Sequence, residues 1–60
     1  METHYYLKLF GQDGSCWDNG TDFSVIEDAR HAARQELESG AAVKVQISDA
    51  AGGLIEEISR

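Results

Sequence analysis

A single helical segment between two alternating segments is the feature that most limits how this chain can fold. Apolar residues recur with a helical period from Val25 to Leu37, and the segments on either side alternate between apolar and polar residues, as strands do. One helix with one apolar stripe must bury that stripe against a sheet. We therefore expect a single α+β domain over residues 1–60, with a four-stranded antiparallel sheet (ββαββ) and one helix packed on one face.

Sequence signals mark both ends of this helix. Ser24 and Glu27 have the S-x-x-E spacing of a capping box, which predicts that the helix starts at Val25. Gly40 supplies the left-handed conformation that commonly ends a helix. Three alanines on the stripe let the helix axis lie close to a sheet. The apolar positions are Val25, Ile26, Ala29, Ala32, Ala33 and Leu37.

Alternation predicts the first strand over Thr3–Phe10, with Tyr5, Leu7 and Leu9 facing inward. The turn chemistry of Gly11–Gly14 predicts a short return strand over Ser15–Asp18. We expect Asn19–Gly20 to break that strand.

A second hairpin follows the helix. Ala42–Ser48 alternates, with Val43, Val45 and Ile47 inward and Lys44, Gln46 and Ser48 outward. Asp49–Gly53 is the predicted loop and Leu54–Ser59 the last strand. Because Leu54 and Ile55 are adjacent apolar residues, two registers stay open. Either Leu54 and Ile58 face inward, or a bulge near Gly53 shifts the register.

One helix cannot cover both faces of such a sheet, so one face stays open or meets another molecule. The outward side of the first strand carries Tyr6 and Phe10, and Cys16 or Trp17 joins them, depending on the register of the hairpin. Tyr6, Phe10 and Trp17 are therefore candidates for an interface with a partner or a second copy. The simpler interpretation is that Tyr6 and Phe10 pack on each other and on the stem of Lys8.

The chain is acidic, with eleven Asp and Glu against five Lys and Arg and a formal charge of -6. Direct binding to DNA or RNA is not expected, because it depends on cations that displace counterions from phosphates. The same field favours a basic partner, such as a nucleic-acid-binding protein. The simpler interpretation is that the charge only keeps the protein soluble. The candidate partner-binding carboxylates are Asp13, Asp18, Asp22, Glu36, Glu38, Glu56 and Glu57.

The sequence contains no pattern that predicts an enzyme, a cofactor or a metal site. Cys16 with a histidine is the only conceivable nucleophile and base pair, and we reject it because His31 belongs to the polar helix face and Cys16 to a strand end. The spacing of Asp18, Asp22 and Glu27 is similar to that of a calcium loop, but the D-x-[DN]-x-[DN]-G pattern fails because Gly20 lies at its third position and Phe23 at its sixth. The glycine-rich segments match no phosphate loop.

Cys16 is the only cysteine, so no intramolecular disulfide can form, and a reducing cytoplasm fits best. The N-terminus lacks a basic segment followed by an apolar run, and no stretch approaches the ~20 apolar residues that span a bilayer. We expect neither export by a recognisable signal nor a membrane anchor.

In size, acidity, absence of a catalytic motif and element order, the chain resembles the small phage-encoded inhibitors of bacterial defence called anti-CRISPR proteins, several of which act as DNA mimics. The resemblance covers the whole chain and rests on general character, without diagnostic residues. It implies an inhibitor that blocks a nucleic-acid-binding partner through its acidic surface. Ala29–Ala33 and Asp49–Gly52 also resemble short bacterial domains of unknown function. The alternative is a cellular accessory domain that forms a homodimer through the open sheet face.

Overall fold

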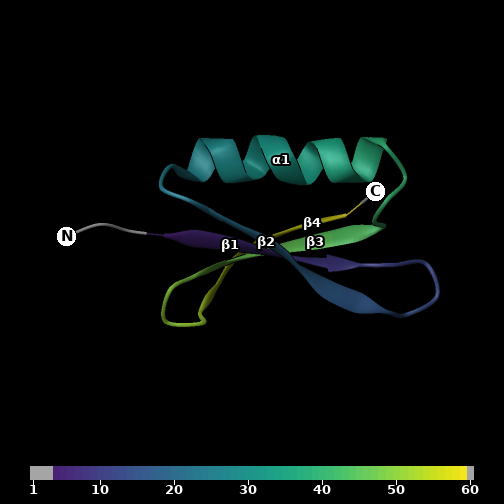
Figure 1. Cartoon of the computed structure of the whole chain (residues 1–60), viewed down its shortest axis with the longest axis horizontal. Coiled ribbons are helices and arrows are strands. Elements are labelled where there is room, and N and C mark those ends of the chain that lie inside the picture. The colour runs from purple at the N-terminus through teal and green to yellow at the C-terminus, as the bar shows by residue number, and fades with distance from the viewer. Residues whose placement is uncertain (1–3, 60) are drawn as a thin grey trace.

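The computed structural model describes residues 4–59, which form one helix and one four-stranded antiparallel sheet. The elements are β1 (Tyr5–Phe10), β2 (Cys16–Phe23), α1 (Ile26–Glu38), β3 (Lys44–Asp49) and β4 (Leu54–Ser59). The helix lies along one face of the sheet, and no other element of residues 4–59 covers the opposite face (Figure 1). The expected α+β class and ββαββ order are confirmed.

The two hairpins join through their first strands, which gives the sheet order β2-β1-β3-β4. Strand β1 is antiparallel to both β2 and β3, so β2 and β3 run in the same direction. The connection between them is α1, which crosses over β1 in a split β-α-β arrangement. This topology places the helix over the middle of the sheet, where it contacts all four strands.

The core forms where the alanine stripe of α1 meets the two central strands. Ala29 and Ala33 are fully buried, and because alanine ends at Cβ the helix axis can lie close to the sheet. The bulk that fills the space comes from the strands, through Leu7 and Leu9 of β1 and Val45 and Ile47 of β3. Leu37 and Ala42 complete the buried cluster, and Tyr5, Phe23, Ile26, Ala32 and Ile58 pack around it.

Strand β2 is longer than we predicted. The prediction that Asn19–Gly20 would break the strand is wrong, because pairing with β1 continues beyond them to Phe23. Gly20 has φ +83°, a conformation that glycine adopts without strain. The chain therefore absorbs extra residues as a bulge and then resumes pairing.

The bulge in β2 preserves the faces of the sheet. Lys8 pairs with Asp18 and Tyr6 with Asp22, so four steps along β2 oppose two steps along β1. The excess is an even number of residues, and side chains alternate with a period of two. Asp18 and Asp22 therefore lie on the same face.

Strand β4 has the predicted bounds, and its register contains a bulge. Ile47 pairs with Glu56 and Ser48 with Leu54, which leaves Ile55 as an extra residue. The bulge alternative is confirmed. Ile58 faces the helix, whereas Leu54 lies on the open face beside Ser48.

The predicted capping box is wrong, and the predicted C-terminal glycine is confirmed. The helix begins at Ile26, and Val25 occupies the N-cap position without a side-chain hydrogen bond. The carbonyl of Val25 accepts the first amide bonds, so Ser24 lies one residue too early to cap, and Glu27 contacts Arg30 instead. At the other end Gly40 has φ +82°.

The remaining strands differ only at their ends from the prediction. Of the predicted strand Thr3–Phe10, Thr3 lies outside the described residues and β1 begins at Tyr5. Strand β3 begins at Lys44 rather than Ala42 and extends to Asp49. Val45 and Ile47 face the helix as expected.

The close approach of helix and sheet predicts that an Ala33→Leu variant is destabilised by about 1 to 3 kcal/mol, because the buried site has no room for three more carbons. Gln35→Leu, which introduces the same side chain on the exposed side of α1, should change stability by less than about 0.5 kcal/mol. Urea unfolding followed by circular dichroism measures both. Equal effects in the two variants would contradict the close packing.

Candidate interaction surface on the open sheet face

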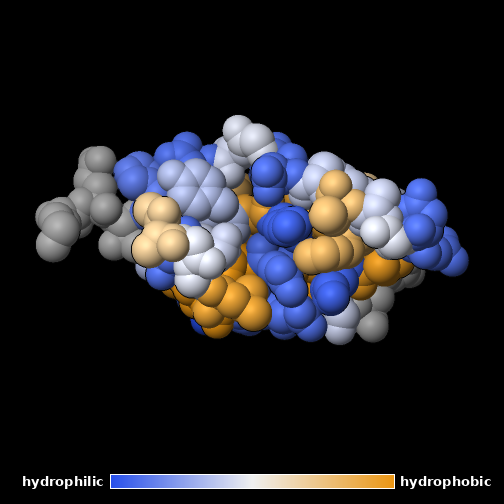
Figure 2. All heavy atoms as spheres, turned by 90° about the horizontal axis from the view of Figure 1, so that it is seen from below, coloured by the Kyte–Doolittle hydropathy of each residue, from blue (hydrophilic) through white to orange (hydrophobic). Residues whose placement is uncertain are grey.

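The face of the sheet opposite α1 is the candidate functional surface, and strand pairing orders its side chains. Residues paired across neighbouring strands point to the same side, so the registers define three rows across the sheet. The first row is Cys16, Phe10, Lys44 and Ser59; the second is Asp18, Lys8, Gln46 and Glu57; the third is Asp22, Tyr6, Ser48 and Leu54. Figure 2 shows this face, with a hydrophilic band across the centre and hydrophobic groups on either side.

The aromatic ring of the first row is covered by cations. Lys44 Nζ lies 4.4 Å from the centroid of the Phe10 ring, and Lys8 Nζ lies 5.9 Å from it. Both separations fall within the range of cation–π attraction. Phe10 is half-buried, whereas Tyr6 in the third row is 42% exposed.

The structure places Trp17 on the other face from Tyr6 and Phe10. Trp17 pairs with Leu9, whose side chain is buried against the helix, so it belongs to the helix side of the sheet. Cys16 pairs with Phe10 and is the residue that joins the open face. The grouping of Trp17 with Tyr6 and Phe10 is therefore wrong, because hairpin register gives Trp17 the parity of Leu9.

The seven candidate carboxylates do not share one surface. Those on the open face are Asp18, Asp22 and Glu57. Glu36 and Glu38 belong to α1, on the other side of the sheet, and Asp13 lies in the loop between β1 and β2. Glu56 pairs with the inward-facing Ile47 and so points toward the helix.

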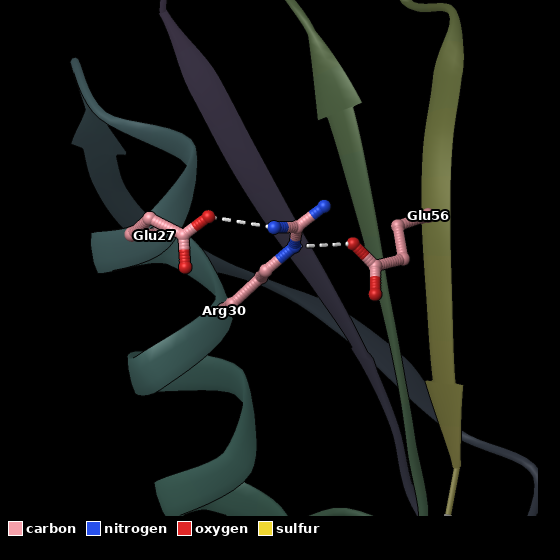
Figure 3. A network of polar contacts seen from close by, with 3 residues as sticks. All are labelled: Glu27, Arg30 and Glu56. Carbon is pink, nitrogen blue, oxygen red and sulfur yellow. Dashed lines mark hydrogen bonds and ion pairs between the residues drawn. The ribbon is translucent and has the colours of Figure 1, made fainter.

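Glu56 is held by the helix. Arg30 donates from Nε to Glu56 Oε1 at 2.6 Å and from Nη1 to Glu27 Oε1 at 2.7 Å (Figure 3). The hydrogen bond and the charge of Glu56, followed by the charge of Glu27, raise the pKa of Arg30 above its usual value. This contact joins α1 to the edge strand β4, so Glu56 has a structural partner.

Asp13 also has a local partner. Its Oδ1 accepts hydrogen bonds from the Ser15 hydroxyl at 2.6 Å and from the Ser15 amide at 3.1 Å. The hydroxyl bond is the largest cause of a lowered pKa at Asp13. Asp13 thus holds the turn between β1 and β2.

Of the open-face carboxylates, Glu57 and Asp22 contact polar side chains, whereas Asp18 has no such contact among the described residues. Glu57 Oε2 accepts a hydrogen bond from Gln46 at 2.9 Å and lies 3.9 Å from Lys44 Nζ. Asp22 Oδ2 lies 2.7 Å from His4 Nδ1. Within residues 4–59 no side-chain hydrogen bond or ion pair involves Asp18.

A hollow of about 350 Å³ opens beside the bulge of β2. It is lined by Tyr6, Leu7, Asp18, Gly20, Thr21 and Asp22. Sequence reasoning missed it, because it interpreted Asn19–Gly20 as the end of a strand. A glycine followed by renewed strand-forming residues was the available signal for a bulge.

The rejected nucleophile and base do not meet in the structure. Cys16 lies on the open face, whereas His31 lies on the exposed side of α1, with its Nε2 3.1 Å from Gln35 Nε2. His4 precedes β1, and Cys16 pairs with Phe10 at the opposite end of that strand, roughly 20 Å away at the usual rise per residue. No group of three or more metal-ligating side chains gathers among the described residues.

Comparison of the chain with protein-family models, with curated proteins and with solved structures gives no significant match. Within residues 4–59, α1 is too short and too polar to cross a membrane.

The bonds at Asp13 predict an effect on its titration. Since its pKa is lowered, its contribution to stability is complete above the ordinary aspartate pKa and is lost as the pH falls through the lowered one. Ser15→Ala should move the pKa of Asp13 back toward its ordinary value, because it removes the largest cause of the shift. Carboxyl ¹³C NMR across an acid titration measures this, with Ser59→Ala as control. An unchanged Asp13 titration in Ser15→Ala would contradict the assignment.

Proposed function

We propose that this chain is a small acidic binding protein that inhibits a nucleic-acid-binding partner by occupying its surface, and that the open sheet face makes the contact. The supporting observation is the third row of that face, where the exposed apolar groups of Tyr6 and Leu54 lie in line with the carboxylate of Asp22. Interfaces commonly combine such aromatic anchors with a polar surround.

Charge gives the class of partner. A net charge of -6 repels nucleic acid itself and attracts a basic protein surface, such as a groove that binds phosphates. The uncompensated carboxylate of Asp18 contributes to that attraction at the contact surface. Electrostatic complementarity of this kind speeds association and weakens as salt rises.

Mimicry of DNA by this protein is local rather than extended. Because the sheet separates Glu36 and Glu38 from Asp18 and Asp22, a single contact presents only some of the carboxylates. Those on the first hairpin stand in for a short run of phosphates, and Tyr6 adds apolar contact. The proposed role is that of an anti-CRISPR-like, phage-type inhibitor working in the reducing cytoplasm, where Cys16 stays a thiol.

A homodimer through the same face is the second candidate function. Leu54 and Ile55 are 59% and 44% exposed on the edge strand, and with Tyr6 they give a second copy an apolar surface to bury. The two functions differ in one measurable quantity. An inhibitor of the proposed kind is a monomer when free, whereas an accessory domain of this kind is a dimer.

Light scattering at increasing protein concentration tests the oligomeric state. We expect a monomer mass at millimolar concentration, because Lys44 of the first row and Lys8 of the second oppose the burial of this face against itself. A wild-type dimer that dissociates in the Tyr6→Ser variant would contradict the inhibitor and support the accessory domain.

The inhibitor is tested by affinity capture from a bacterial lysate, followed by binding measurements with the purified partner. Tyr6→Ser should weaken binding at least about tenfold, as expected for an aromatic anchor. Trp17→Ser is the matched control, since Trp17 is 41% exposed but lies on the other face. The wild type should also displace labelled nucleic acid from the partner, measured by fluorescence anisotropy. Binding that survives Tyr6→Ser and fails in Trp17→Ser would contradict the proposed surface.

A further inference from the structure

The geometry points to a specific occupant for the hollow beside the β2 bulge. We propose that it receives an arginine side chain of the partner, held between the carboxylates of Asp18 and Asp22. This inference rests on the proposed function, because it names the group by which the partner is bound.

The shape of the hollow suits a long side chain with a polar tip. Its volume of about 350 Å³ lies at the small end of the range for ligand pockets. Tyr6 provides apolar wall, while Thr21, Asp18 and Asp22 provide polar groups. A Cβ placed on Gly20 would meet nothing within 4 Å, so the bulge leaves this side unobstructed.

The hollow carries negative charge because Lys8, the lysine nearest to Asp18 in the strand pairing, does not pair with the Asp18 carboxylate. Lys8 is the cross-strand partner of Asp18, yet its ammonium lies over the ring of Phe10, 5.9 Å from the centroid. Among residues 4–59, the one ion pair of Asp22 is with the imidazole of His4, at 2.7 Å from one carboxylate oxygen. Within the described part of the chain, a cation from another molecule therefore finds Asp18 without an ionic partner and Asp22 with one carboxylate oxygen beside His4.

The spacing of the acids favours a guanidinium over an ammonium. Asp18 and Asp22 pair with residues two positions apart on β1, so they are separated by roughly 7 Å along the strands. A planar guanidinium carries N–H donors on opposite edges and can donate to both carboxylates at about 2.8 Å. An ammonium is a compact point charge that reaches one. Arginine also stacks on aromatic rings, and Tyr6 lies in the wall.

Arginine is also the side chain that the proposed class of partner offers. Proteins that bind nucleic acids use arginine for bidentate contact with phosphate. An arginine held by two carboxylates cannot contact a phosphate at the same time. Occupation of this hollow would thus account for inhibition through one side chain.

The test uses the whole protein and small probes, so it does not depend on identifying a partner. N-acetyl-argininamide is titrated into ¹⁵N-labelled protein and compared with N-acetyl-citrullinamide, its neutral isostere, and with N-acetyl-lysinamide. We expect saturable amide shifts over residues 18–22 with the arginine probe, a weaker response with lysine and none with citrulline. Equal shifts with citrulline would overturn the proposal.

Matched variants separate this site from general attraction to an acidic protein. The double variant Asp18→Asn, Asp22→Asn should have at least about tenfold lower affinity for the arginine probe, since charge-assisted hydrogen bonds are lost. Glu36→Gln with Glu38→Gln changes the net charge equally and should leave binding unchanged. Equal losses in the two pairs would show non-specific attraction and overturn the proposal. Thr21→Arg places a guanidinium beside the hollow at an exposed position, and binding that persists in that variant also counts against it.

The outcomes also distinguish this inference from the proposed function. If the arginine probe fails to bind while Tyr6→Ser still weakens binding of the purified partner, the proposed contact surface is retained and the proposal of an arginine in the hollow is wrong. If the probe binds while the affinity for the partner is unchanged in Tyr6→Ser and in the aspartate variants, the hollow is a binding site and the proposed docking face is wrong.

Discussion

The contact between the alanine stripe of α1 and the two central strands is the interaction on which the rest of this structure depends. Chains of this size bury a limited share of their surface, so they have one core and little reserve. Here Ala29 and Ala33 let the helix approach Leu7, Leu9, Val45 and Ile47, and these apolar groups are fully buried. Because the helix packs on one side of the sheet, the opposite face has no covering element within residues 4–59. The candidate surface is exposed because residues 4–59 contain a single helix, and it covers the other face.

The edge strands differ from the central ones in a way that shapes this surface. Strands β1 and β3 pair without register shifts, whereas β2 and β4 each contain a bulge. Bulges are common at sheet edges, where they twist a strand and discourage unwanted pairing with other chains. The bulge in β2 also makes the hollow, and the bulge in β4 turns Leu54 outward. The same irregularities that protect the edges thus create the features of the proposed contact surface.

Elements whose signals are local were predictable from the sequence. Alternation located β1, β3 and β4, and Gly40 marked the end of the helix. The face of Trp17 was not predictable, because it depends on the register of a hairpin whose turn permits several. The capping box failed because the helix begins one residue later, leaving Ser24 out of reach. Similarly, the list of acidic residues contained no information on which side of the sheet each would lie.

The two bulges differ in parity, and this bears on how the chain can change in length during evolution. The excess in β2 is two residues, so a relative lacking two residues near Gly20 would keep every side chain of the hairpin on its present face and would form a regular ladder. It would retain the core and lose only the hollow. The excess in β4 is one residue, and removing Ile55 alone would likewise give a regular ladder, with Leu54 still opposite Ser48 and Glu56 still opposite Ile47. Natural length variation that keeps both faces should therefore come in a step of two residues in the first hairpin and of one residue in the second.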